Sequence, residues 1–179
     1  MGFTPLDGLV MGTRCGSLDP GVILYLEQER GMTVKQVEDL LYRHSGLLGV
    51  SGGIASDMRT LLADGSARAN EAIELFVYRV AREIAALTGS LGGLDGLVFT
   101  AGIGEHAREI RTLVCERLRW LGVDVDPHAN AKGAAIISSA QSRVTVRIIP
   151  TDEEAMIAQH TLDTIRALHP VEDEASRNV

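Results

Sequence analysis

An arginine in a glycine-containing loop near the start of the chain is the first residue that could do chemistry. Arg14 stands between Thr13 and Cys15, shortly before Asp19. A guanidinium group can bind a phosphate or carboxylate through two parallel hydrogen bonds, which phosphoryl transfer needs as charge spreads over the transferring group. A single arginine in a loop is also commonly a solvated surface charge. Arg14 is therefore a candidate anion-binding residue, with a surface charge as the alternative.

A glycine-rich turn is the second candidate. The run Gly102-Ile103-Gly104-Glu105 lies between a short apolar segment and a segment with helical periodicity. The backbone amides of such a turn and the positive end of the helix dipole could face a nucleotide. The alternative is a tight strand-to-helix connection whose glycines need a positive φ.

Acidic residues at two predicted helix starts are the remaining candidates. Asp57, with Arg59 close behind it, follows a glycine loop and either caps a helix or orients a nucleotide. Glu153 and Glu154 follow a predicted strand, where the helix dipole favours acids. A hard cation on nucleotide phosphates takes one or two carboxylates plus waters, so one of these glutamates could also bind Mg²⁺. The five histidines have no spacing typical of a metal site.

Capping residues and apolar periodicity predict the elements that hold these candidates. Helices are expected after Asp19, after Thr33, and from Ser66 with inward-facing Ala69, Ile73, Phe76, Val80, Ile84 and Leu87. The stretch from Ser45 to Asp57 is expected to be a loop. A strand near Leu97 to Thr100 should lead through the glycine turn into a helix with Ile110, Val114 and Leu118 inward. A second strand from Val144 to Ile149 and a closing helix from Glu153 to about Leu168 complete the pattern.

Composition limits the class of protein. With 179 residues, 45% of them hydrophobic, the chain can bury one core, and we expect one mixed α/β domain over residues 1–168 and a polar tail over 169–179. A net charge of -7 argues against nucleic acid and anionic membranes as partners. Two widely separated cysteines and the absence of a leader or membrane segment predict free thiols and a cytoplasmic location.

Four segments, in this order, resemble the acetate and propionate kinase family. They are MGFTPLDGLVMGTRCGSLDP, which resembles the family signature, SGLLGVSGGIASDMR and VFTAGIGEH, which resemble its nucleotide and adenosine loops, and IPTDEEAMIA, which resembles its magnesium-contacting stretch. The resemblance implies the fold of the superfamily of acetate kinase, sugar kinases, heat-shock proteins and actin, a ribonuclease H-like lobe with a mixed sheet flanked by helices. It also implies that the chain is the C-terminal lobe, on the nucleoside side of the cleft, and that the lobe forms a homodimer.

The resemblance assigns roles by position. Arg14 matches the arginine that stabilises the transferring phosphoryl group, Pro5 matches a wall of the pocket for the acetate methyl group, and Glu153 matches the magnesium-associated glutamate. The expected nucleotide contacts are Asp57, Met58 and Arg59, together with Gly102, Ile103, Gly104, Glu105 and His106. The family usually has Asn where this chain has His106, and often Asn where it has Asp152.

The implied reaction is ATP plus acetate giving ADP and acetyl phosphate by in-line attack of a carboxylate oxygen. A carboxylic acid with a pKa of about 4 is already ionised at neutral pH, so catalysis rests on positioning and on neutralising charge with arginine and Mg²⁺. The resemblance puts the phosphate-binding loops, a catalytic aspartate and a second arginine in the other lobe, so we expect the chain alone to be inactive or nearly so. Two alternatives remain: a non-catalytic domain that dimerises and binds ADP, or propionate or butyrate as the acceptor.

Overall fold

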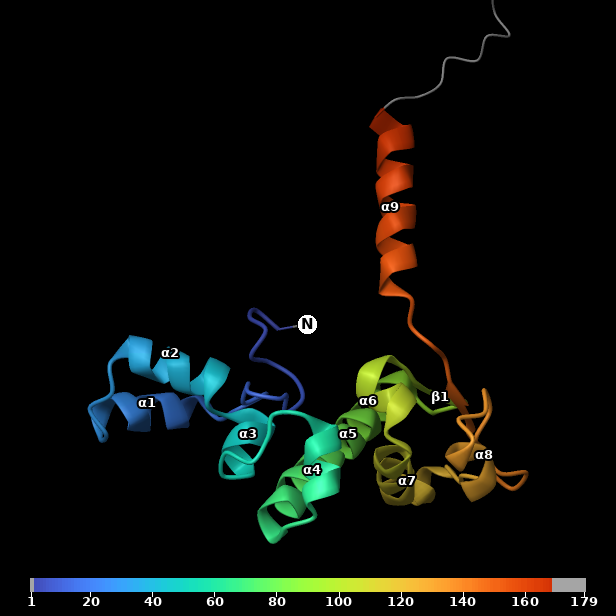
Figure 1. Cartoon of the computed structure of the whole chain (residues 1–179), viewed down its shortest axis with the longest axis horizontal. Helices are drawn as coiled ribbons and strands as arrows, with labels where there is room; N and C mark the ends of the chain where they lie inside the picture. The colour runs from blue at the N-terminus through green and yellow to red at the C-terminus, as the bar shows by residue number, and fades with distance from the viewer. Residues whose placement is uncertain (1, 169–179) are drawn as a thin grey trace, which may run out of the picture. The chain divides into compact units, whose positions relative to one another are not determined.

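The computed structural model describes residues 2–168, which form helices and a small parallel sheet (Figure 1). The chain divides into two units, Met1–Ile149 and Pro150–Val179. The polar tail predicted over residues 169–179 lies outside the described residues. None of the helices in residues 2–168 combines the length and the apolar character needed to cross a bilayer.

The first two helices begin where their caps predict. Helix α1 spans Pro20–Gln28, and the Asp19 carboxylate accepts a hydrogen bond from the amide of Gly21 at 2.8 Å. Helix α2 spans Val34–Arg43 and begins with a reciprocal capping box between Thr33 and Gln36. A side chain that accepts from an unpaired amide of the first turn stabilises a helix start, so both starts were predictable from sequence.

The segment expected to be a loop, from Ser45 to Asp57, begins with a short helix, so that prediction was wrong at Gly46–Val50 and correct over residues 51–57. Helix α3 spans Gly46–Val50, and its Leu47 side chain is 2% exposed. Five residues are too few to make a stable helix alone. Burial of Leu47 in the core therefore supplies the stabilisation that the glycine-rich sequence does not indicate.

Helices α4 and α5 form the centre of the first unit. Helix α4 spans Met58–Asp64, and the 25-residue helix α5 spans Ala67–Leu91, capped by the Ser66 hydroxyl. The predicted inward stripe of α5 is correct at Ala69, Ile73 and Phe76, which are buried, and at Val80 and Ile84, which are partly buried. Leu87 is 54% exposed, contrary to expectation, because the buried face of α5 continues through Thr88 instead.

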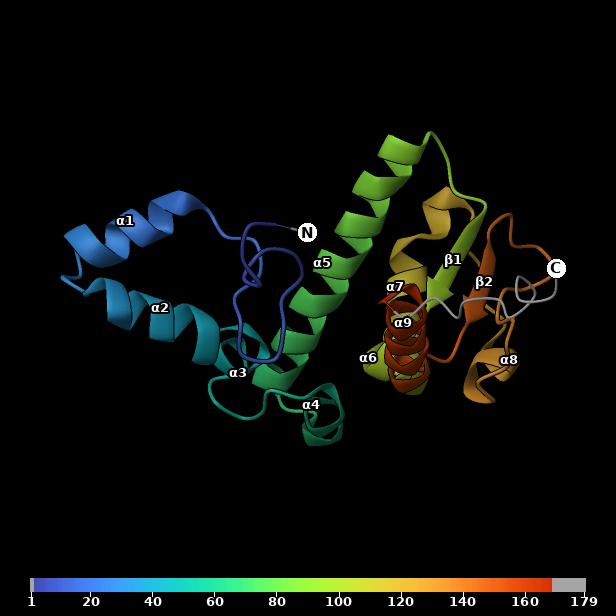
Figure 2. The same cartoon turned by 90° about the horizontal axis from the view of Figure 1, so that it is seen from above.

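Two parallel strands make up the sheet of the described residues, and Figure 2 shows them side by side. Strand β1 spans Gly96–Phe99 and strand β2 spans Thr145–Ile148, each within one residue of its predicted start. Their register pairs Gly96 with Thr145 and Phe99 with Ile148. Outside the sheet, Ile136 forms an isolated antiparallel bridge with Arg147 of β2. The predicted combination of helices with a small sheet is therefore confirmed, but the sheet of the described residues is parallel and not mixed.

Helices cover the rest of the first unit. Helix α6 spans Ala101–His106 and α7 spans Arg108–Arg117, followed by the short 3₁₀ helix η1, Arg119–Leu121, and by α8, Pro127–Ala131. The predicted inward residues of this region are all buried: Ile110, Val114 and Leu118. In the second unit, α9 spans Glu153–Leu168, the predicted closing helix, and none of its residues is buried.

Candidate functional site

Arg14 lies in a half-buried loop at the start of the first unit. Its Nη1 atom donates a hydrogen bond to the carbonyl oxygen of Pro5 at 3.2 Å. The structure therefore brings together the two residues for which anion binding and an acceptor pocket were predicted. Pro5 itself is exposed.

Backbone contacts with α2 and α3 fix the loop that carries Arg14. The Thr13 hydroxyl donates to the carbonyl of Tyr42 at 2.8 Å, and the amide of Leu47 donates to the carbonyl of Met11 at 2.9 Å. Gly46 has a φ of 63°, and a Cβ atom there would stand 2.2 Å from the carbonyl oxygen of Met11. Only glycine allows the loop to approach the start of α3 this closely.

The same loop also contacts the second predicted segment. The carbonyl of Gly12 accepts from the amide of Leu48 at 2.9 Å. A Cβ atom at Gly12 would stand 2.6 Å from the carbonyl oxygen of Ser56, the residue before Asp57. Two motifs about 40 residues apart in the sequence therefore pack backbone to backbone.

Asp57 is the N-cap of α4. Its carboxylate accepts a hydrogen bond from the Thr60 amide at 2.9 Å, and this bond lowers the pKa of Asp57 below its ordinary value of 3.8. Arg59 is exposed, whereas the Met58 side chain is 4% exposed and packs in the core. Asp57 and Arg59 can thus reach a ligand with their side chains, and Met58 can do so only through its backbone.

The predicted glycine turn is the short helix α6 and not an open loop. Gly102 and Gly104 do not adopt a positive φ, and the left-handed residue is Ala101, with a φ of 57°. Gly104 is needed for close packing, because a Cβ atom there would lie 3.3 Å from the backbone of Phe99 in β1. The expectation that these glycines supply positive φ was therefore wrong, and close packing against the strand explains Gly104.

Sequence reasoning missed a buried polar pair beneath this turn. Arg111, on α7, is 2% exposed and Asn130, on α8, is 3% exposed. The Arg111 Nη1 atom donates to the carbonyls of Gly104, at 2.9 Å, and Glu105, at 2.7 Å. The signal in the sequence is its position: Arg111 stands three residues before Val114 on the apolar face of a helix, where a charge is unusual.

Glu153 begins α9 in the second unit and is exposed. The Asp152 carboxylate accepts from the amide of Ala155 at 2.9 Å, so the position where the family often has Asn acts as a cap here. Within residues 2–168, no three His, Cys, Asp or Glu side chains are grouped so that they could hold a metal ion.

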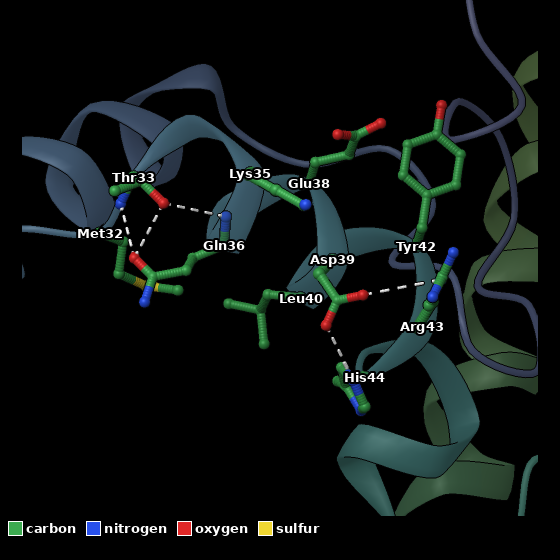
Figure 3. A pocket seen from close by; sticks show the side chains of 10 residues that line it. All are labelled: Met32, Thr33, Lys35, Gln36, Glu38, Asp39, Leu40, Tyr42, Arg43 and His44. Atoms are coloured by element: carbon green, nitrogen blue, oxygen red, sulfur yellow. Dashed lines mark hydrogen bonds and ion pairs between the residues drawn. The ribbon is translucent and has the colours of Figure 1, made fainter.

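None of the predicted site residues lines a pocket that runs along α2. Figure 3 shows this cavity of about 880 Å³ along α2, lined by residues from Met32 to His44. Its polar groups already bind one another: Thr33 pairs with Gln36, and the Asp39 carboxylate lies 3.1 Å from Nε2 of His44. A helix cap and a surface ion pair account for these contacts, so this pocket is a poor candidate for the catalytic site.

Comparison with known families identifies the chain. The family model of the acetokinases matches residues 1–159. The chain belongs to the acetokinase family. Among relatives of known sequence, the acetate kinase of Rhodopseudomonas palustris strain TIE-1 is 65% identical over 162 residues, and that of Rickettsia felis is 52% identical over 162 residues. These alignments cover 89% and 90% of this chain, but 40% and 42% of the relatives.

Solved structures of the acetokinase family have the same fold. The acetate kinase of Porphyromonas gingivalis matches with a TM-score of 0.83 and 38% identity, over 92% of this chain and 43% of that protein. A propionate kinase from Francisella tularensis matches with a TM-score of 0.83 and 42% identity, over 89% of this chain and 41% of that protein. The predicted ribonuclease H-like α/β fold is therefore confirmed. The chain spans about 40% of the length of the relatives it matches.

Proposed function

We propose that this chain is part of an acetate kinase that converts ATP and acetate into ADP and acetyl phosphate. The packing of the Arg14 loop against the segment before Asp57 carries the proposal. This contact holds a candidate phosphoryl-binding arginine close to a candidate nucleotide-binding segment, as a phosphotransferase requires. The relatives named acetate kinase support the same reaction.

We propose further that the chain is the C-terminal lobe of that enzyme. The order of the four motifs in the sequence supports this assignment. Superposition of residues 2–149 on the acetate kinase of Porphyromonas gingivalis tests it, because the chain should fall on the second half of that protein. Superposition on the first half would overturn the assignment.

In the proposed mechanism, the ionised acetate needs no general base. Arg14 would bind the transferring phosphoryl group as its charge spreads, and the loop that holds Arg14 against Pro5 would orient that guanidinium. The exposed Asp57 and Arg59 and the turn from Gly102 to His106 would contact ATP or ADP. The reaction then depends on the placement of ATP and acetate more than on proton transfer.

Magnesium would arrive with the nucleotide. The described residues hold no group of three metal-binding side chains, but a cation bound to ATP phosphates and waters needs only one or two carboxylates. Glu153 fits that requirement as a single exposed carboxylate. Glu153 would be one of the residues that hold Mg²⁺, and Mg²⁺ would supply neutralisation of phosphate charge.

Acetate is the proposed acceptor, with propionate as the second candidate because one structural neighbour is named a propionate kinase. One extra methylene changes the binding free energy that separates two acceptors by only about 1–3 kcal/mol.

We also propose that the complete enzyme is a cytoplasmic homodimer. The free cysteines, Cys15 and Cys115, support a reducing compartment. A domain that only dimerises and binds ADP is the alternative without catalysis.

The test uses the purified chain with ATP, Mg²⁺ and acetate, and traps acetyl phosphate as the hydroxamate. We expect almost no product from the chain alone, and product when a second polypeptide supplies the part of the Rhodopseudomonas palustris enzyme that the chain lacks. Turnover by the chain alone at a rate typical of kinases would contradict the incomplete-site proposal. Calorimetry with ADP separates the alternatives, since no heat at millimolar ADP would remove the nucleotide-binding role.

A further inference from the structure

A buried arginine beneath the Gly102–His106 turn has no carboxylate within ion-pair distance among residues 2–168. Arg111 is 2% exposed, and the ion pairs within residues 2–168 do not include it. Burial lowers the pKa of Arg111 below its ordinary value, yet an arginine stays charged in proteins. Glu109 acts on this charge electrostatically but makes no direct ion pair with it. A buried charge without a direct ion pair is costly, so hydrogen bonds must compensate for the lost hydration of the guanidinium.

The guanidinium is bound instead by oxygen atoms at the end of α6. Nη1 donates to the carbonyls of Gly104 and Glu105, both in the last turn of α6. Helix α6 has six residues, no side-chain cap at its start, and the left-handed Ala101 as its first residue. Such a segment is not stable by itself, so its shape depends on contacts from outside.

Asn130 holds the guanidinium in place. Arg111 Nε donates to the Asn130 side-chain oxygen at 2.7 Å, and Nη2 donates to its backbone carbonyl at 3.1 Å. The Asn130 amide nitrogen donates in turn to the carbonyl of Arg108 and to the hydroxyl of Thr112. One buried network therefore joins α6, α7 and α8.

We propose that Arg111 and Asn130 are positioning residues that set the backbone of the Gly102–His106 turn and thereby the affinity of that turn for a nucleotide. The nucleotide part rests on the proposed function, whereas the effect on the turn does not. Lysine cannot take the place of Arg111. All N–H donors of a lysine are on one nitrogen atom, so they cannot reach the oxygens of Gly104, Glu105 and Asn130 together.

The first measurement is amide hydrogen exchange along the whole chain. Arg111→Lys and Asn130→Ala should speed exchange at residues 101–107 by about tenfold or more, because each removes hydrogen bonds to or from a charged group. Asn130→Asp keeps the acceptor for Arg111 Nε and should restore part of the protection. The control is Val77→Ala, a cavity variant in α5 at a residue that is 2% exposed, compared at a matched loss of melting temperature.

The second measurement is the ADP dissociation constant of the same variants. We expect Arg111→Lys to weaken ADP binding by about tenfold and the Val77→Ala control to leave it nearly unchanged. Unchanged exchange at residues 101–107, or equal acceleration in α5, would overturn the positioning role. Faster exchange with unaltered ADP affinity would overturn the nucleotide part. If the unmutated chain binds no ADP, the proposed function fails, and the exchange data still decide the effect of Arg111 on the turn.

Discussion

The guanidinium Nη1 atom of Arg14 donates a hydrogen bond of 3.2 Å to the carbonyl oxygen of Pro5. A guanidinium carries five N–H donors in a fixed fork, so this bond orients the group and leaves the larger part of the fork for a ligand. The bond is also the only side-chain hydrogen bond that Arg14 makes within residues 2–168. The predicted phosphoryl-binding and acceptor-binding residues are therefore parts of one loop.

Replacing Arg14 should abolish activity and leave the fold intact. In the enzyme completed by its missing part, Arg14→Ala should lower the rate of acetyl phosphate formation on the order of a thousandfold, because charge on the transferring phosphoryl group loses its partner. Arg14→Lys should recover little, since a lysine cannot bind with two parallel bonds. The hydroxamate assay measures the rate. Arg30→Ala, at an exposed arginine after α1, is the matched control, and an equal loss there would refute a specific role for Arg14.

Substitutions of Asp57 should separate capping from nucleotide binding. Asp57→Asn keeps an oxygen for the Thr60 amide, so Asp57→Ala should lower the melting temperature more than Asp57→Asn, whereas both should weaken ADP binding if the charge contacts the nucleotide. The hydrogen bond lowers the pKa of Asp57, so its contribution to stability is present at neutral pH and is lost as the pH falls below 3.8. The difference in melting temperature between wild type and Asp57→Ala should shrink in acid. Normal ADP affinity in Asp57→Asn would leave capping as the only role of Asp57.

The predictions that succeeded rest on local physics. Asp19, Thr33, Asp57 and Ser66 each cap a helix where a short polar side chain precedes an apolar pattern, and that signal needs no tertiary structure. Strands β1 and β2 were visible as short apolar runs beside turn residues.

The failures rest on tertiary contacts. Helix α3 forms because Leu47 is buried, and α6 takes its shape above Arg111 and against Phe99, neither of which a local pattern records. The proximity of Gly12 to Ser56 is likewise a contact between distant segments. The candidate residues could thus be named from the sequence, but the network that positions the Gly102–His106 turn could not.

The two cysteines should differ sharply in reactivity. Burial raises the pKa of the Cys115 thiol to about 12, and this residue is 3% exposed, whereas Cys15 is only half-buried. The thiolate is the reactive form, so Cys115 should stay unmodified by iodoacetamide at pH 8 while Cys15 reacts slowly. Peptide mass spectrometry measures both sites, and denaturant should expose both equally. Labelling of native Cys115 at the rate of Cys15 would contradict the burial of α7 described above.

Glu153 and Glu154 offer a matched pair for testing the metal. Both are exposed acids in the first turn of α9, so Glu153→Gln and Glu154→Gln should change helix stability alike. If Glu153 binds Mg²⁺, only its substitution should raise the Mg²⁺ concentration needed for half-maximal rate in the completed enzyme, by about tenfold or more. A titration of rate against free Mg²⁺ measures this. Equal shifts in the two variants would contradict a specific role of Glu153, and no shift in either would leave both glutamates to the helix dipole alone.

Strand β1 has consequences for handling the protein. Its one strand neighbour among the described residues is β2, and Val98 at its centre is 48% exposed. A strand with an open edge presents a row of N–H and C=O groups that pair readily with another chain. The chain should therefore aggregate increasingly as its concentration rises. A polypeptide that contributes a strand beside β1 should keep the chain in solution.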